Sequence, residues 1–165
     1  MVTARTHPLQ AAIETLASMP AFLESALARV PRSRWSHKPS PGAFSLTEQA
    51  CHLRDVEREA YVVRARRVLQ EGEPSLEGFD GAAVALERDY AEQDAKRAAQ
   101  DFAAARRELV ALLGATTPGD IARTASFMEE RVTLGRLVEM MVEHDREHRE
   151  EIAALARTLE EAGWR

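Results

Sequence analysis

The sequence has little cysteine, no long apolar run and no excess of basic residues, and each shortage excludes a class of protein. The single cysteine, Cys51, excludes an internal disulfide and suits a reducing compartment, so we expect a cytoplasmic protein. No apolar run approaches the roughly 20 residues that a membrane-spanning helix requires, so we expect no membrane partner. The formal net charge of −5 argues against nucleic acid as a partner, because phosphate binding requires a basic surface.

The residues that are abundant favour helix. Ala, Leu, Glu and Arg dominate, whereas runs of β-branched residues are scarce. Hydrophobic residues make up 45% and charged residues 30% of the 165 positions, which is ordinary for a helical protein with a buried core. We expect residues 1–165 to form one domain, because no internal repeat or linker divides them.

Four long segments have apolar residues at helical spacing. Ser45-Leu46-Thr47-Glu48 is a capping box that predicts where the second helix begins, and Thr133 is a suitable N-cap for the fourth. Pro20 lacks an N–H group and is expected to kink or restart the first helix. The expected helices span about 8–30, 45–70, 83–114 and 134–155, and the last fades near Gly163.

The connections between these helices are irregular. Residues 31–44 are rich in Pro and predict a long loop between the first two helices, and residues 116–130 predict no long element before the fourth. The stretch 72–81, before the third helix, is either a plain connector or long enough to cover a pocket. No alternating strand pattern competes with helix. The sequence therefore predicts an all-α four-helix bundle.

Two histidines interrupt the apolar face of the last helix. His144 lies three residues after Met141, and His148 lies four residues further on, so both are expected to point inward. Buried imidazoles at this spacing are neighbours roughly 6 Å apart, and few polar residues are at hand to bond them. A divalent metal ion removes the energetic cost of burying imidazole nitrogens without partners, since neutral imidazole nitrogens are good ligands.

A third histidine shares the expected inner face of the second helix. That face includes His52, which lies near Gln49, Leu53, Val56, Ala60 and Val63 in helical phase. We therefore expect His52, His144 and His148 to converge. Three protein nitrogens with one open position describe a catalytic metal site, whereas a structural site normally has four protein ligands. The alternative is that the three are satisfied core histidines.

Several charged residues near these histidines are candidates for supporting roles. A carboxylate that accepts the far N–H of a ligating imidazole fixes the ring, and four acidic residues are candidates: Glu48, Asp55, Asp145 and Glu151. Glu59 lies two turns after His52 and is a candidate general base. Each of these acids is otherwise a solvated helix charge. Arg106 interrupts the apolar face of the third helix and either pairs with a core carboxylate or binds an anionic group of the substrate.

Two other kinds of metal protein fit the spacing poorly. A ferritin-like bundle requires paired Glu-x-x-His motifs, but Gln49, Met141 and Asp145 stand three residues before the three histidines. His144-Asp145-x-x-His148 is similar to the zinc-protease motif, with Asp in place of the catalytic Glu. Asp is one methylene shorter, and only 17 residues follow His148, which leaves little room for a further ligand.

With these residues identified, the chain resembles the DinB-like (DinB/YfiT) superfamily. The resemblance is carried by Phe44-Ser45-Leu46, where many members have Trp-Ser, by His52-Leu53-x-Asp55 and by His144-Asp145-x-x-His148. It implies a bundle of down-up-up-down topology in which His52, His144 and His148 hold a divalent ion such as zinc or nickel. It also implies a homodimer, since members often pair through bundle faces.

Known members of this superfamily include metal-dependent hydrolases and transferases or isomerases that use low-molecular-weight thiols. The expected function is therefore a metal-dependent enzyme acting on a small molecule, in which the metal activates either water or a thiol co-substrate. The alternative is a metal-binding or stress-response module without catalytic activity.

Overall fold

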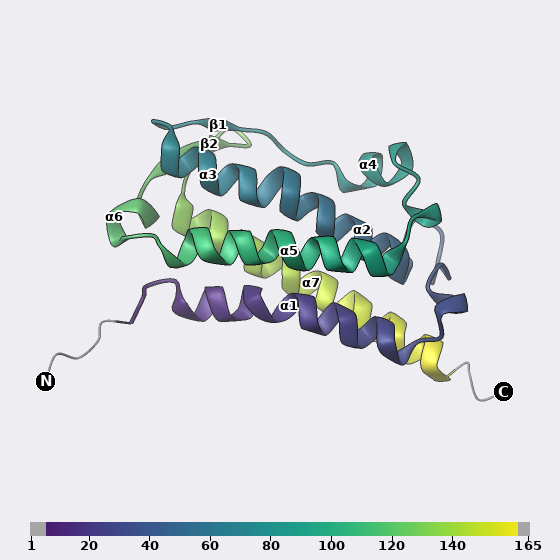
Figure 1. Ribbon diagram of the computed structural model, residues 1–165. Helices are drawn as coiled ribbons and strands as arrows, with labels where there is room; N and C mark the ends of the chain where they lie inside the picture. The colour runs from purple at the N-terminus through teal and green to yellow at the C-terminus, as the bar shows by residue number, and fades with distance from the viewer. Residues whose placement is uncertain (1–5, 162–165) are drawn as a thin grey trace, which may run out of the picture.

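Four long helical segments lie side by side along the molecule (Figure 1). The computed structural model describes residues 6–161, so the expected fading of the last helix near Gly163 lies outside the described residues. The second segment is one continuous helix in which a π-helical turn separates two α-helical parts. The segments are α1 (Gln10–Arg29), α2 (Leu46–Val56) with η2 (Glu57–Tyr61) and α3 (Val62–Gln70), α5 (Ala95–Gly114), and α7 (Leu134–Glu161).

The direction of the helices confirms the predicted bundle. In Figure 1, α1 and α7 run one way and the α2–α3 segment and α5 run the other way, which is the down-up-up-down order. Helix α1 packs against α7 and α5, and α2 packs against α5. The two neighbours α2 and α5 are therefore parallel, and the chain must return along the bundle between them.

The returning segment, residues 71–94, crosses the outer side of α2 and α3 (Figure 1). It contains β1 (Ser75–Leu76), α4 (Gly81–Glu87) and η3 (Tyr90–Glu92). The predicted single helix over 83–114 is therefore wrong. Asp89 is left-handed, with φ of 50°, and the Asp94 side chain accepts hydrogen bonds from the backbone N–H groups of Lys96 and Arg97. This N-cap makes α5 begin at Ala95.

A small sheet was not predicted. Strands β2 (Thr124–Phe127) and β3 (Glu130–Thr133) pair antiparallel, with Ala125 opposite Val132, and β1 pairs parallel with β2. Each strand has four residues or fewer, which is too short to show alternation in the sequence. The short helix α6 (Pro118–Ile121) precedes β2 in the chain. The sheet joins the crossing segment to the start of α7.

The two predicted helix starts are confirmed. The Ser45 hydroxyl accepts from Glu48 N at 3.2 Å, and Glu48 Oε2 accepts from Ser45 N at 2.8 Å, which completes the capping box. The Thr133 hydroxyl accepts from Arg136 N at 3.0 Å, so Thr133 caps α7. Both bonds satisfy N–H groups that a helix end leaves without partners.

Pro20 does not restart α1, which is one helix from Gln10 to Arg29. In a regular helix the N–H of residue 20 would donate to the carbonyl of Leu16, and proline has no N–H. The Leu16 carbonyl instead accepts from Nη1 of the buried Arg106 at 2.8 Å. A side chain from α5 therefore supplies the missing donor.

The π-helical turn η2 changes the inner face of the second segment. Val63 was predicted to point inward but is 41% exposed, whereas Val62, Ala65 and Val68 are buried. A π-helical turn has i→i+5 hydrogen bonds and so holds an extra residue, which shifts every later side chain by one position. Glu57, the first residue of this turn, is also buried.

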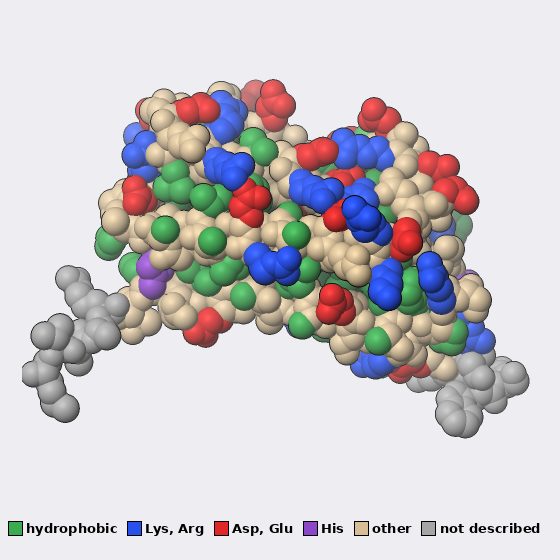
Figure 2. All heavy atoms as spheres, in the orientation of Figure 1, with side chains coloured by type: hydrophobic (Ala, Val, Ile, Leu, Met, Phe, Trp, Pro, Cys, Tyr) green, Lys and Arg blue, Asp and Glu red, His purple; other side chains and the backbone are tan. Residues whose placement is uncertain are grey.

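The outer surface carries charges of both signs. Figure 2 shows acidic and basic side chains interspersed over the face on which α5 lies. Among residues 6–161, no helix is both long enough and apolar enough to cross a membrane.

Candidate metal centre

Three histidines from two helices meet in the core. His52 projects from α2, and His144 and His148 project from α7. One nitrogen of each ring lies within 4.8 Å of one nitrogen of the other two. Nε2 of His52 and Nε2 of His144 are 3.1 Å apart, and the centroids of the His144 and His148 rings are 4.3 Å apart. The structure therefore brings together the three histidines expected from the sequence.

The surroundings of these rings keep them neutral. Burial, followed by the proximity of His148, lowers the pKa of His52 to about 3. The same two causes lower the pKa of His144 to about 2, and burial also lowers the pKa of His148. At neutral pH each ring therefore has a nitrogen lone pair. Metal ions bind histidine in this neutral form.

Gln49 fixes the orientation of His148. Nδ1 of His148 lies 2.7 Å from Oε1 of Gln49, an atom that only accepts hydrogen bonds, so the ring proton is on Nδ1 and the lone pair on Nε2. The amide of Gln49 in turn donates to Oε2 of Glu151 at 2.7 Å. Sequence reasoning had placed Gln49 on the inner face but gave it no role, although its position three residues before His52 puts it beside the site.

The other two rings lack such a partner. Nδ1 of His52 and Nδ1 of His144 are buried and have no hydrogen-bond partner within residues 6–161. Gly81, the first residue of α4, lies against the Nδ1 edge of His52, where a Cβ atom would be 2.8 Å from Nδ1 and 2.6 Å from Cε1. Only glycine fits this contact. The crossing segment therefore packs directly on the histidine cluster.

A cavity of about 740 Å³ opens beside the three histidines. Its wall is largely apolar and aromatic, and it comes from α2–α3, the crossing segment and the turn between β2 and β3. Of the two readings of residues 72–81, the structure supports the pocket cover, because Gly78, Phe79 and Asp80 line the cavity. The other lining residues include Phe44, Tyr61, Arg64 and Phe127.

The donor set suits a divalent metal ion. Three neutral imidazoles from two rigid helices, facing a cavity, match the ligand number and type of catalytic zinc sites. The family profile of the DinB superfamily matches residues 15–152 of the sequence. The chain belongs to the DinB superfamily.

One solved structure similar to this DinB superfamily member is YfiT from Bacillus subtilis. The two share 22% sequence identity and superpose with a TM-score of 0.84, over 100% of this chain and 93% of YfiT. YfiT is described as a probable metal-dependent hydrolase with an unusual four-helix-bundle topology. At this identity the likeness establishes the fold. No curated protein matches the sequence.

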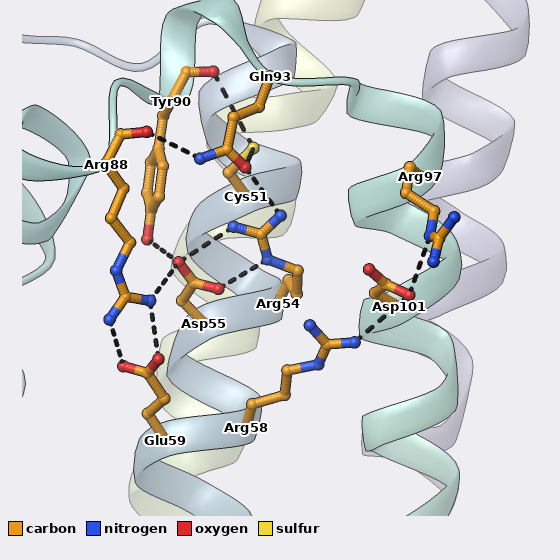
Figure 3. A network of polar contacts seen from close by, with 10 residues as sticks. All are labelled: Cys51, Arg54, Asp55, Arg58, Glu59, Arg88, Tyr90, Gln93, Arg97 and Asp101. Atoms are coloured by element: carbon orange, nitrogen blue, oxygen red, sulfur yellow. Dashed lines mark hydrogen bonds and ion pairs between the residues drawn. The ribbon is translucent and has the colours of Figure 1, made fainter.

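In this DinB superfamily member, two residues predicted to act at the metal lie elsewhere (Figure 3). Asp55 accepts hydrogen bonds from Arg54, Arg88 and the Tyr90 hydroxyl, and from no histidine. Burial by itself would raise the pKa of Asp55, but the hydrogen bonds from Arg54 and Tyr90 hold it below its ordinary value. Glu59, the predicted general base, is exposed and forms two hydrogen bonds with Arg88. It does not line the cavity.

Three acidic residues were predicted to accept from ligand histidines, besides Asp55. Glu48 is bound to the N-terminus of α2 and to Lys38, which is a capping role. Asp145 is bound to Arg106. Only Glu151 lies beside a histidine of the cluster, with Oε2 3.5 Å from Nδ1 of His148. Helical phase thus predicts which acids lie near the histidines, but other donors bind Glu48 and Asp145.

Arg106 is a core residue. It is 1% exposed, and its guanidinium donates to both oxygens of Glu57 and both oxygens of Asp145 at 2.5 to 3.0 Å. Burial opposes the charged form, but Glu57 and Asp145 raise the pKa of Arg106 above its ordinary value. The structure thus matches the core-pairing alternative, and the buried guanidinium has no free surface for a substrate. Glu57 was missed, although it lies four residues after the buried Leu53 and helical phase places both on one face.

Proposed function

We propose that this chain is a metal-dependent hydrolase of small molecules, in which His52, His144 and His148 hold a divalent ion such as zinc or nickel. The observation that carries the proposal is the cluster of three neutral imidazoles beside a cavity of about 740 Å³. The description of YfiT as a metal-dependent hydrolase of the same topology supports the same reaction class.

The residues around the cavity have distinct roles in this proposal. Three protein ligands leave a coordination position for water or substrate, and a bound ion supplies a Lewis acid that polarises the substrate and acidifies water. Gln49 holds the ring of His148, and Gly81 leaves room for the ring of His52. Tyr61 lies edge-on to His144, with ring centroids 5.6 Å apart, and also lines the cavity. Burial raises the pKa of Tyr61, so its hydroxyl stays protonated and acts as a hydrogen-bond donor.

A second candidate function is transfer of a group to a low-molecular-weight thiol. The observation that favours it is Arg64, which lines the same cavity. Thiol co-substrates carry carboxylates, and a cation near the metal would hold them. The homodimer and the cytoplasmic location expected from the sequence stay predictions.

Metal content tests the metal site directly. The protein is purified without an affinity tag, and the metal per chain is measured by mass spectrometry for wild type, His144→Ala and the control His37→Ala, whose histidine is exposed in the loop before α2. We expect metal in wild type and His37→Ala and little in His144→Ala. Equal, negligible metal in all three proteins would refute the site.

Turnover separates an enzyme from a metal-binding module. The metal-loaded protein is assayed against a panel of small esters, amides and thiol conjugates, with His148→Ala as the inactive control. Hydrolysis that His148→Ala abolishes supports the proposal, and thiol-dependent turnover alone supports the second candidate. A protein that gains thermal stability from metal but turns over none of the panel is a binding module.

A further inference from the structure

Arg64 is a buried cation without a counter-ion. Its residue is 9% exposed, and its guanidinium has one hydrogen-bond acceptor within residues 6–161, the backbone carbonyl of Glu77, which accepts from Nη2 at 2.9 Å. Nε is buried and has no partner, and Nη1 donates to no described residue. No described carboxylate lies within ion-pair distance of it. Burial lowers the pKa of Arg64, as expected for an uncompensated charge.

Two other largely buried arginines among residues 6–161 have carboxylate partners. Arg106 is bound by Glu57 and Asp145, and Arg54 is bound by Asp55. A buried charge without a partner destabilises a folded protein, so a ligand of opposite charge is expected where one is kept. Arg64 is also the only arginine or lysine among the described residues that line the cavity.

The position of Arg64 is built by the small sheet. Its Cζ atom lies 4.4 Å from the centroid of the Phe127 ring at the end of β2, and Glu77, which follows β1, supplies the carbonyl. The ring of Tyr61 lies 6.0 Å from Cζ on one side and 5.6 Å from the ring of His144 on the other. Arg64 and the histidines therefore face one cavity, with the Tyr61 ring in contact with both.

We propose that Arg64 is the anion-binding residue of this cavity and that the substrate carries a carboxylate, bound by Arg64 on the sheet side while its reacting group lies at the histidines. This inference rests on the proposed function for the role of the histidines. A carboxylate fits better than a phosphate, because one guanidinium matches one negative charge and a phosphate carries about −1.5 to −2. The aromatic wall suits the carbon skeleton between the two groups.

Two matched hydroxamate probes test the proposal. A hydroxamate group binds the metal, and succinic monohydroxamic acid adds a carboxylate that butyrohydroxamic acid lacks. Affinities for zinc-loaded protein are measured by calorimetry for wild type, Arg64→Met, Arg64→Lys and the control Arg66→Met, which removes an exposed arginine of α3 paired with Glu108. A charge-assisted hydrogen bond corresponds to roughly tenfold to a hundredfold in affinity.

We expect wild type and Arg66→Met to prefer the carboxylate-bearing probe by that factor, Arg64→Met to bind both probes equally, and Arg64→Lys to retain part of the preference. Unchanged binding of butyrohydroxamic acid shows that Arg64→Met is folded. A preference that is absent in wild type, or that survives in Arg64→Met, overturns the inference while leaving the metal site intact.

If neither hydroxamate binds, the proposed metal function fails. Anion binding by Arg64 is then tested separately. Metal-free protein is titrated with succinate and with uncharged succinamide. Selective binding of succinate that Arg64→Met removes supports the anion site without a metal. Absence of that selectivity overturns the inference as well.

Discussion

The core contacts of Arg106 predict that Arg106→Met strongly destabilises the protein. The guanidinium makes five buried hydrogen bonds, four to the carboxylates of Glu57 and Asp145 and one to the Leu16 carbonyl. Removing one partner of a buried ion pair costs about 3–5 kcal/mol, because the remaining charge is left uncompensated. Since whole domains are stable by about 5–15 kcal/mol, this is a large fraction. The loss is measured by urea unfolding of metal-free protein, with the exposed Arg107→Met as control, for which about 0.5 kcal/mol or less is expected.

The pH dependence of this loss has a definite sign. Burial already raises the pKa of Glu57 in wild type, and without Arg106, whose charge and hydrogen bonds lower it, the pKa of Glu57 rises further in the folded state. A raised folded-state pKa contributes stability at low pH that is lost as pH rises through that pKa. The difference between wild type and Arg106→Met should therefore be smaller at pH 5.5 than at pH 8. A difference below about 1 kcal/mol at pH 8, or one that grows on acidification, would refute this account of the triad.

The fifth hydrogen bond can be isolated with Pro20. In Pro20→Ala the new N–H donates to the Leu16 carbonyl, so that carbonyl no longer depends on Arg106. Arg106→Met should then cost about 1 kcal/mol less in the Pro20→Ala background than in wild type, the usual contribution of one hydrogen bond. Equal costs in the two backgrounds would show that the Leu16 contact contributes nothing.

Three further predictions concern the histidine cluster. Gly81→Ala should weaken zinc binding roughly tenfold to a hundredfold, because its Cβ would displace His52, whereas Gly78→Ala in the same loop has open space and should not. Gln49→Leu should weaken zinc binding by a similar factor through the loss of its bond to His148, and unchanged affinity would contradict the orienting role. In metal-free folded protein the pKa of His52 is about 3 in place of 6.5, so the ring takes up a proton only after unfolding. Protonation of His52 in the unfolded chain should therefore lower the free energy of unfolding by about 1 kcal/mol between pH 6.5 and 5.5. His52→Asn should flatten that fall in urea unfolding.

Local signals made much of the fold predictable. The capping box at Ser45 and the N-cap at Thr133 act within one helical turn, so sequence spacing alone locates them. The histidine pair on α7 is similar, since two residues four apart on an unbroken helix share a face whatever the rest of the chain does. On these regular α-helical stretches, the faces predicted from helical phase match the structure.

Helical phase predicts the wrong inner face beyond the π-helical turn η2. The π-helical turn adds one residue to the second segment, so His52, which precedes it, was placed correctly and Val63, which follows it, was not. Glu57, the first residue of the turn, is in helical phase with the buried Leu53, so its place in the core could have been predicted. The extra residue of a π-helical turn cannot be recognised from composition or periodicity. Contacts with other helices stabilise the turn, such as the ion pair of Glu57 with Arg106 of α5.

The wall of the cavity depends on topology in the same way. Because α2 and α5 are parallel neighbours, residues 71–94 must cross the bundle, and their path lies over the histidines. The sequence shows only that this stretch contains Gly and Pro. That Gly81 must be glycine follows from its contact with His52, and such a contact between distant segments has no local signature.

The choice between two arginines shows what sequence reasoning lacks. The sequence offered Arg106 either as a partner of a core carboxylate or as a residue for an anionic substrate, and it gave no sign that Arg64 faces the site. What decides the matter is the position of carboxylates from other helices. Arg106 is paired with Glu57 and Asp145, whereas the one hydrogen-bond acceptor of Arg64 within residues 6–161 is a backbone carbonyl. A buried guanidinium is available to a ligand only where the fold has left it without a carboxylate. That condition is a property of the packed helices, so it becomes visible only when they are placed together.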